Sequence, residues 1–299
     1  LNYDYQREKF NKAYQTQTTT TPETTRQAEA WVQKYQQVQL NASLTYTGTF
    51  AEKHNLEAMI GGEYYTYNQF DFEAKTQGSP TDDVPTLNVG SNRTFTRTEK
   101  TAYRILSGFG RINYNYNMKY LLSFTARYDG ISRLKDNRWG FFPSGALGWR
   151  ISEEEFFKNV SWLEKNVNNL KLRFSYGQVG NDQIAPYAYA QTLSSSQRQA
   201  IFGDGAIPAL YTSRMANPEI SWEVTEEFDG GLDLDMFNNR LNISLDLYTK
   251  TTRDMLLEQN LPRTSGFGKV TRNIGSVRNR GFEISIGGCL LYTSDAADE

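Results

Sequence analysis

The chain has 299 residues, with 32 basic against 34 acidic side chains and 14% aromatic residues. This near-neutral balance provides no basic surface for nucleic acid. No run of about 18 apolar residues is present, which excludes a helical membrane protein but not a barrel, whose strands are half polar. One histidine and one cysteine exclude an internal disulfide and leave almost nothing for a transition-metal site or a thiol nucleophile. We therefore expect neither a cofactor nor a catalytic site.

Apolar and polar residues alternate along much of the first half of the chain, which is the pattern of strands with one apolar and one polar face. In chain order the sequence predicts a Thr-rich loop at 15–27, a strand at 30–50, a tight turn at 52–55, a strand from 56 to about 72, a loop at 78–98, a strand at about 102–116 and a short turn at 115–118. Residues 1–10 resemble the end of one more strand and carry no secretory leader, so we expect the true N-terminus to lie further upstream.

Residues 120–151 predict a hairpin of two long strands. From 120 to 129 the even-numbered side chains are apolar and the odd-numbered ones are mostly polar, and after a polar connection at 130–138 the alternation resumes at 141–151. Each strand has at least ten residues, which is roughly what a bilayer crossing at about 45° of tilt requires.

The same hairpin carries a long motif. The pattern reads approximately R-Y-D-G-S-S-R-F, several residues, then W-G-x-F-P-S-x-S-x-G-W-R-I-S-x-E-x-F. The residues that fit it are Arg127, Tyr128, Asp129, Gly130, Ser132, Arg133, Trp139, Gly140, Phe142, Pro143, Ser144, Gly148, Trp149, Arg150, Ile151, Ser152, Glu155 and Phe157. This stretch resembles the mid-barrel signature of SusC/RagA-type TonB-dependent outer-membrane transporters.

The C-terminal part resembles the same family in its N-P-x-L-x-W-E, G-L-D-F, N-R-L, D-x-Y-x-K-x-T-x-D-L-L, G-F and N-x-G-x-V-x-N-x-G-x-E motifs. The matching residues are Asn217, Pro218, Trp222, Glu223, Gly231, Leu232, Asp233, Phe237, Asn239, Arg240, Leu241, Asp246, Tyr248, Lys250, Asp254, Leu256, Leu257, Gly266, Phe267, Asn273, Ile274, Gly275, Val277, Asn279, Gly281 and Glu283. The resemblance extends over about residues 31–287. Residues 289–299 instead resemble translated sequencing adaptor, and we interpret them as a non-native tail on a domain formed by residues 1–288.

The resemblance implies an all-β, antiparallel transmembrane barrel in the outer membrane of a Gram-negative cell. A family barrel has roughly 22 strands, of which this chain supplies about ten, so more than half of the wall and the whole plug lie outside it. The resemblance also implies import of oligosaccharides or peptides too large for porins. The implied partners are a SusD-like surface lipoprotein, the TonB complex acting through the absent plug and N-terminus, outer-membrane lipid and the substrate.

The connections give a separate indication of a barrel. Ser152 as a cap, acidic residues in the first turn and apolar residues at helical spacing predict one short helix within 152–168. A strand follows at 169–180, then a loop at 181–219, a tight turn at 237–240 and a loop at 258–275. If the helix lies at the end of the sheet that carries the tight turns, tight and long connections alternate throughout the chain. Outer-membrane barrels show the same alternation, with short periplasmic turns and longer extracellular loops.

Polar side chains on the strands are candidates for a solute path. Arg127 and Asp129 lie on the polar face of one strand and Arg150 on that of its neighbour, which predicts a charge network on the lumen side; a structural network is favoured over a solute path. Asp233 and Asp235 share a face and could act as paired acids or as cation ligands, but without His, Cys or a third ligand a solvated lumen face is favoured.

Aromatic residues form two further groups. Tyr187, Tyr189, Phe202 and Tyr211 fall in the 181–219 loop and could bind sugars or a peptide, although loop aromatics often only pack the loop. A second set is predicted to form interfacial girdles near strand ends: Tyr64, Tyr65, Tyr67, Tyr114, Tyr116, Tyr120, Trp139 and Trp149.

Two other classes of protein compete with the transporter. A soluble or secreted glycan-binding β-protein would suit the loop tyrosines, but it requires polar outer faces, whereas Leu241, Ile243, Leu245 and Leu247 form an apolar stripe. A barrel lipase or protease would need a Ser/His/Asp set, and the single histidine, His54, falls in a short turn on the predicted periplasmic side.

Overall fold

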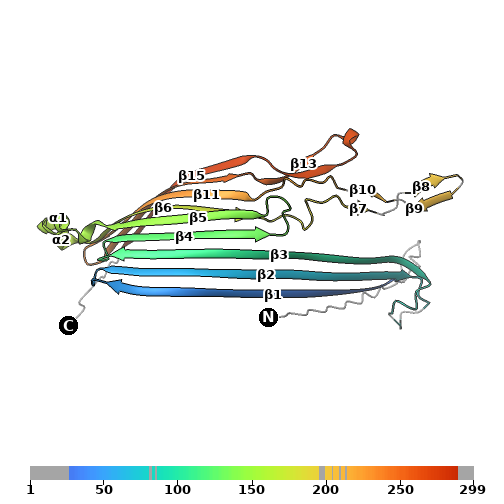
Figure 1. The fold of residues 1–299 in the computed structure, drawn as a ribbon, viewed down its shortest axis with the longest axis horizontal. Coiled ribbons are helices and arrows are strands. Elements are labelled where there is room, and N and C mark those ends of the chain that lie inside the picture. The colour runs from blue at the N-terminus through green and yellow to red at the C-terminus, as the bar shows by residue number, and fades with distance from the viewer. Residues whose placement is uncertain are drawn as a thin grey trace, which may run out of the picture. The chain divides into compact units, whose positions relative to one another are not determined.

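The computed structural model describes residues 27–80, 83–84, 86–194, 199–203, 205–208, 210–212 and 214–288, and these are predominantly antiparallel strands (Figure 1). The long strands are β1 (Gln27–Phe50), β2 (His54–Gln77), β3 (Asn92–Tyr116), β4 (Tyr120–Ile131), β5 (Trp139–Arg150), β6 (Val167–Asn181), β11 (Glu223–Met236), β12 (Leu241–Arg253) and β15 (Ser276–Gly288). The predicted all-β antiparallel fold is confirmed. A tenth predicted strand, at 1–10, and the predicted tail at 289–299 lie outside the described residues, and so does the predicted loop at 15–27 apart from Gln27, which begins β1.

The long strands form one sheet in the order β1-β2-β3-β4-β5-β6-β11-β12-β15, so each pairs with the long strands before and after it in the chain. Among the described residues β1 and β15 have one neighbour each, and the sheet is therefore open. At one end of the sheet, consecutive strands are joined by tight turns. Ala51 and Glu52 both have positive φ, as do Asn117 and Met118, which is the backbone of the two-residue turns that match the twist of paired strands.

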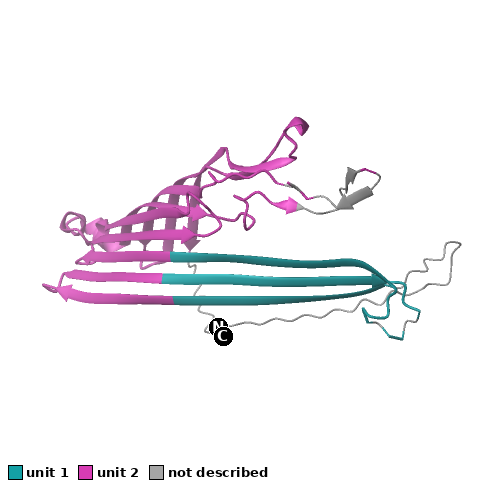
Figure 2. Cartoon of the chain, turned by 45° about the vertical axis from the view of Figure 1, so that its right-hand side comes forward, with its two compact units in different colours: residues 1–40, 63–106 teal, residues 41–62, 107–299 magenta. Residues whose placement is uncertain are grey.

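The chain divides into two compact units (Figure 2). The first comprises residues 1–40 and 63–106, and its described part contains segments of β1, β2 and β3. The second comprises residues 41–62 and 107–299 and contains the turn-proximal segments of those strands together with β4 to β15. With 24 or 25 residues each, β1, β2 and β3 have about twice the length that a bilayer crossing needs.

The two faces of the sheet differ in chemistry in the second unit. Leu245 lies opposite Leu232 on β11 and Ile284 on β15, and Leu247 lies opposite Gly230 and Phe282. The apolar side chains of this face are largely exposed, with Leu247 at 56% and Phe282 at 70%. The opposite face carries polar residues of the same strands, among them Asp233 on β11 and Ser244 and Asp246 on β12. We call these the apolar face and the polar face.

Aromatic residues mark two levels on the apolar face. Tyr128 stacks on Trp139 with ring centroids 5.0 Å apart near one end of the β4–β5 hairpin, and Tyr120 lies opposite Trp149 near the other. Trp139 and Trp149 are ten residues apart on β5. At about 3.3 Å per residue and about 40° of tilt, that spacing corresponds to roughly 25 Å along a membrane normal, the height of the apolar band of outer-membrane barrels.

Three tyrosines predicted for a girdle lie elsewhere. Tyr64, Tyr65 and Tyr67 fall near the middle of β2, which is longer than its pattern indicated. Tyr67 stacks on Tyr103 at 5.0 Å, and Tyr65 also contacts that ring, so these two pack across strands of the first unit. The prediction that they lie near a strand end was wrong, because β2 continues for ten residues beyond Tyr67, to Gln77.

The predicted helix is present but broken into short pieces. A 3₁₀ turn, η1 (Ile151–Glu153), leads into α1 (Glu155–Lys158) and α2 (Ser161–Asn166). Ser152 does not cap a helix: it is buried within η1, and the residue before α1 is Glu154, in an extended conformation. Because η1 occupies residues 151–153, Glu154 rather than Ser152 is the residue that precedes α1. Among the described residues, no helix is long and apolar enough to cross a membrane.

The connections on the other side contain small hairpins. β7 (Leu193–Ser194) pairs with β10 (Tyr211–Thr212), β8 (Gln199–Phe202) with β9 (Gly205–Pro208), and β13 (Leu256–Asn260) with β14 (Lys269–Asn273), with a 3₁₀ turn η2 (Arg263–Ser265) between the last two. The predicted 78–98 loop is shorter than expected. β3 begins at Asn92, because the threonines at 94, 96 and 98, with Phe95 between the first two, favour an extended strand beyond the turn-forming residues.

Candidate functional site

The strongest charge cluster on the polar face of the second unit is centred on Arg173 of β6. Its Nε lies 2.8 Å from Oδ2 of Asp233 on β11, and its Nη2 lies 2.8 Å from Oδ1 of Asp246 on β12. Ser244 joins the cluster by donating to Asp233 Oδ1 at 2.9 Å. One guanidinium thus pairs with two carboxylates on two strands, which links the charges of β6, β11 and β12 on this face.

A glycine makes this arrangement possible. Arg173 lies directly opposite Gly231 on β11, and Gly231 lies directly opposite Asp246 on β12. A Cβ at Gly231 would come within 2.8 Å of Arg173 Cζ and closer still to the Asp246 carboxylate. Because real Cβ atoms do not approach so closely, a side chain at position 231 would displace the Arg173 guanidinium, the Asp246 carboxylate or both.

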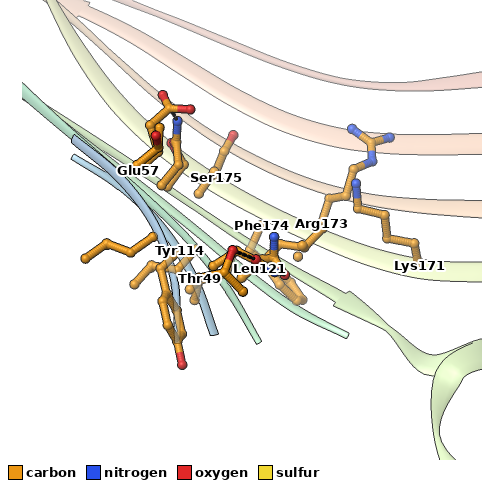
Figure 3. A pocket seen from close by; sticks show the side chains of 18 of the residues that line it. Thr49, Glu57, Tyr114, Leu121, Lys171, Arg173, Phe174 and Ser175 are labelled. Atoms are coloured by element: carbon orange, nitrogen blue, oxygen red, sulfur yellow. Dashed lines mark hydrogen bonds between the residues drawn. The ribbon is translucent and has the colours of Figure 1, made fainter. Parts of the chain in front are cut away.

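The polar face also contains a hollow of about 590 Å³ within the second unit (Figure 3). Amide and hydroxyl groups form a chain along part of its lining: Asn113 donates to Glu57 Oε1 at 3.3 Å, and Ser123 donates to Asn113 Oδ1 at 2.7 Å. Lys171 and Arg173 contribute two positive charges. The same lining also contains apolar side chains, those of Leu121, Leu122, Leu147 and Phe174. The hollow thus combines hydrogen-bonding groups and both signs of charge with apolar surface, which suits contact with water, a solute of mixed polarity or a protein segment.

The predicted network of Arg127, Asp129 and Arg150 forms only in part. Arg127 Nε donates to both oxygens of Asp129 at 2.7 and 2.8 Å, and its Nη2 donates to Ser107 Oγ at 2.9 Å. Arg150 lies near the opposite end of β5, opposite Lys171, and pairs with Glu153 at 3.4 Å. Strand register therefore separates Arg150 from the other two.

The predicted pair of aspartates is also divided. Asp233 belongs to the Arg173 cluster, whereas Asp235 accepts from Asn169 Nδ2 at 3.1 Å and from Asn242 Nδ2 at 2.7 Å. Among the residues that the structure describes, no group of three His, Cys, Asp or Glu side chains is arranged to hold a metal ion.

Of the four aromatic residues predicted to bind a ligand in the 181–219 loop, the structure describes the side chains of two. Tyr187 is exposed and has positive φ, and Tyr189 is half-buried. The side chains of Phe202 and Tyr211 lie outside the described residues. Their role in binding stays a prediction.

A packed cluster forms at the loop end of the second unit instead. Ile131, Leu134, Ile220 and Val270 are almost fully buried. Trp222 contacts the ring of Phe142 edge-on at 5.2 Å and donates from Nε1 to the carbonyl of Arg138. Several residues that carried the family resemblance therefore hold loops to strand ends.

Polar contacts join the same loops. Asn273 Nδ2 donates to the carbonyls of Ser221 and Asp254, and Glu223 accepts from the backbone N–H of Leu256 and from Asn181. Arg133 pairs with Asp182 at 3.3 Å. Burial raises the pKa of Asp182, and the neighbouring guanidinium opposes that rise.

Comparison with known proteins decides the family. Residues 1–296 match the family described as "TonB dependent receptor-like, beta-barrel". The chain belongs to this family. It is 36% identical over 253 residues to the TonB-dependent receptor SusC of Bacteroides thetaiotaomicron, covering 81% of this chain and 24% of SusC. It is also 36% identical over 251 residues to the TonB-dependent receptor P3 of Formosa agariphila, again covering 81% of this chain and 24% of the relative.

A solved structure supports the same assignment. The structure of the RagAB peptide transporter superposes with a TM-score of 0.76 and 29% identity, covering 91% of this chain and 29% of that one. The SusC/RagA-type resemblance is thereby confirmed. The chain spans about a quarter of the length of the curated relatives it matches.

Proposed function

We propose that this chain forms part of the barrel wall and the extracellular loops of a TonB-dependent importer in the outer membrane. The observation that carries the proposal is the pairing of an exposed apolar face, bounded by Trp139 and Trp149 about a membrane thickness apart, with a charged and amide-rich opposite face. Such a wall separates lipid from a wet lumen.

The cargo is a large nutrient, either an oligosaccharide or a peptide. A SusD-like surface lipoprotein closes the barrel from outside, and the TonB complex supplies the energy through parts of the protein beyond this wall. The family membership supports these partners, and the long connections on one side supply the surface on which a lid would rest. In this role the wall residues bind and guide cargo and catalyse no reaction.

The first test is genetic. The gene that encodes the complete parent is deleted, and uptake of fluorescent oligosaccharide and peptide pools is followed in the deletion strain and after complementation, with and without a functional TonB. The proposal predicts uptake of one pool only in complemented cells with active TonB. Uptake that does not depend on TonB, or no uptake of either pool together with a soluble parent, would contradict it.

The genomic neighbourhood provides a second test. A plug-coding region in the same reading frame and an adjacent lipoprotein gene are expected. An intact reading frame without a plug would argue against energy-coupled import.

A further inference from the structure

The pieces of helix after β5 present apolar side chains to solvent. Phe156, Val160 and Trp162 are 59%, 47% and 60% exposed, whereas the neighbouring Phe157 is 5% exposed and anchors α1. Phe156 lies in α1, and Val160 is the extended residue before α2, with its N–H donating to the carbonyl of Phe157 at 3.2 Å. A soluble surface would rarely expose three large apolar residues in seven positions.

Hydrogen bonds fix where these residues lie on the wall. Glu154, immediately before α1, accepts from the Tyr120 hydroxyl at 2.6 Å and from Trp149 Nε1 at 3.1 Å. Tyr120 and Trp149 point from the apolar face at the turn end of the sheet. The start of α1 is therefore tied to the side of the wall that faces lipid, at the level of the aromatic girdle. Figure 1 shows α1 and α2 at that end of β4, β5 and β6.

The charges of the segment fit the edge of a membrane. Lys119 lies 3.4 Å from Glu154, and Lys158 pairs with Glu153 at 2.8 Å. Glu164 and Lys165 are exposed on α2. Basic, acidic and aromatic side chains mixed around an apolar patch are typical of segments that lie in the headgroup region, where tryptophan is favoured.

We propose that η1, α1 and α2 form an interfacial anchor, with Phe156, Val160 and Trp162 inserted into the phospholipid leaflet beside the turn end of the barrel. The occupant of the patch is the phospholipid bilayer itself, because the patch continues the apolar face through the Tyr120–Glu154–Trp149 contacts. The anchor fixes the depth of the wall, so that the short turns stay at the membrane edge. This inference rests on the proposed membrane barrel.

The test uses the complete parent protein, in a background from which other reactive cysteines have been removed, reconstituted in phosphatidylglycerol and phosphatidylcholine vesicles. A Trp162→Cys variant carries an environment-sensitive fluorophore, which is challenged with nitroxide-labelled phospholipid and with aqueous iodide. Glu164→Cys, two residues away on the same helix, is the matched control. Leu247→Cys on the apolar face reports whether the wall itself contacts lipid.

The anchor predicts several-fold stronger nitroxide quenching at position 162 than at 164, and stronger iodide quenching at 164. Equal iodide access at both positions would overturn it, and so would shielding of 162 from both quenchers, which would indicate a protein partner. If position 247 is not quenched by the nitroxide lipid, the membrane wall fails, independently of the anchor. Phe156→Cys in the same assay replaces Trp162→Cys should that variant not fold.

Discussion

Arg173 on β6 reaches Asp246 on β12 across Gly231, the residue directly between them on β11. The contact spans two strand spacings, so it ties three strands of the wall together rather than two. Backbone hydrogen bonds link only neighbouring strands, whereas this guanidinium adds a side-chain link on the polar face.

The first prediction concerns that glycine. Gly231→Ala should force Arg173 and Asp246 apart and lower the free energy of unfolding by about 1 to 2 kcal/mol, since a charge-assisted hydrogen bond is lost on a partly exposed surface. Gly230→Ala is the matched control, because a Cβ there would meet Phe174 at an ordinary 3.7 Å. Urea titration of the reconstituted parent measures both. An equal loss of unfolding free energy in the two variants would show that the missing side chain at Gly231 is not what permits the contact between Arg173 and Asp246.

The second prediction concerns the apolar face. Leu245→Arg should destabilise the reconstituted parent by about 2 to 4 kcal/mol, because it places a charge in the middle of the lipid-facing band. Ser285→Arg is the control: Ser285 lies opposite Ser244 on the polar face and is exposed. Ser244 itself is unsuitable, since its hydroxyl bonds Asp233. A bilayer refolding titration in which both variants lose the same stability would show that the faces are assigned wrongly.

The third prediction concerns orientation. In a parent without other reactive cysteines, single cysteines placed at Val84 and Leu210, in long connections, should react with an impermeant maleimide added to whole cells. Asn238→Cys, in the turn between β11 and β12, should react only after the outer membrane is opened. Labelling of position 238 on intact cells would reverse the assignment of the extracellular side.

The fourth prediction concerns pH and the start of α1. Hydrogen bonds from Tyr120 and Trp149, together with Lys119, lower the pKa of Glu154 below its ordinary value of 4.5. A carboxyl whose folded-state pKa is depressed stabilises the fold above its unfolded pKa, and that contribution is lost as pH falls through the folded value. The protection factor against hydrogen exchange across residues 155–158, which removes the intrinsic pH dependence of the exchange rate, should therefore decrease below pH 4.5.

The control for this effect is Glu154→Gln, which keeps an acceptor but cannot titrate. The protection factor of residues 155–158 in this variant should not fall through titration of residue 154. The difference in protection factor between the variant and the wild type should therefore shrink at low pH. An identical pH dependence in both proteins would mean that another group controls α1.

Much of the wall followed from the sequence alone. Period-two alternation in residues 120–129 and 141–151 predicted the β4–β5 hairpin, and the apolar stripe from Leu241 to Leu247 predicted one face of β12; both agree with the strands found. These predictions succeed because alternation is local and each strand shows it by itself.

The charge clusters could not be predicted in the same way. Whether Arg150 meets Arg127 depends on where two strands pair, and the register places Arg150 opposite Lys171. Arg173 was on a polar face, but its contact with Asp246 required both the β6–β11 and the β11–β12 registers. The turn-forming residues also led to a wrong strand start: alternating threonines at 94, 96 and 98 extend β3 into the predicted loop, back to Asn92.

The central claim, that one face of this wall meets lipid and the other meets water, is tested most directly by spin labels placed one at a time along β12, from residue 241 to residue 249, in the reconstituted parent. Collision with oxygen, which concentrates in lipid, is compared with collision with a water-soluble nickel complex. The account predicts a period of two, with oxygen favoured at Leu241, Ile243, Leu245 and Leu247 and nickel at Asn242 and Tyr248. A flat profile, or alternation with the opposite phase, would contradict it.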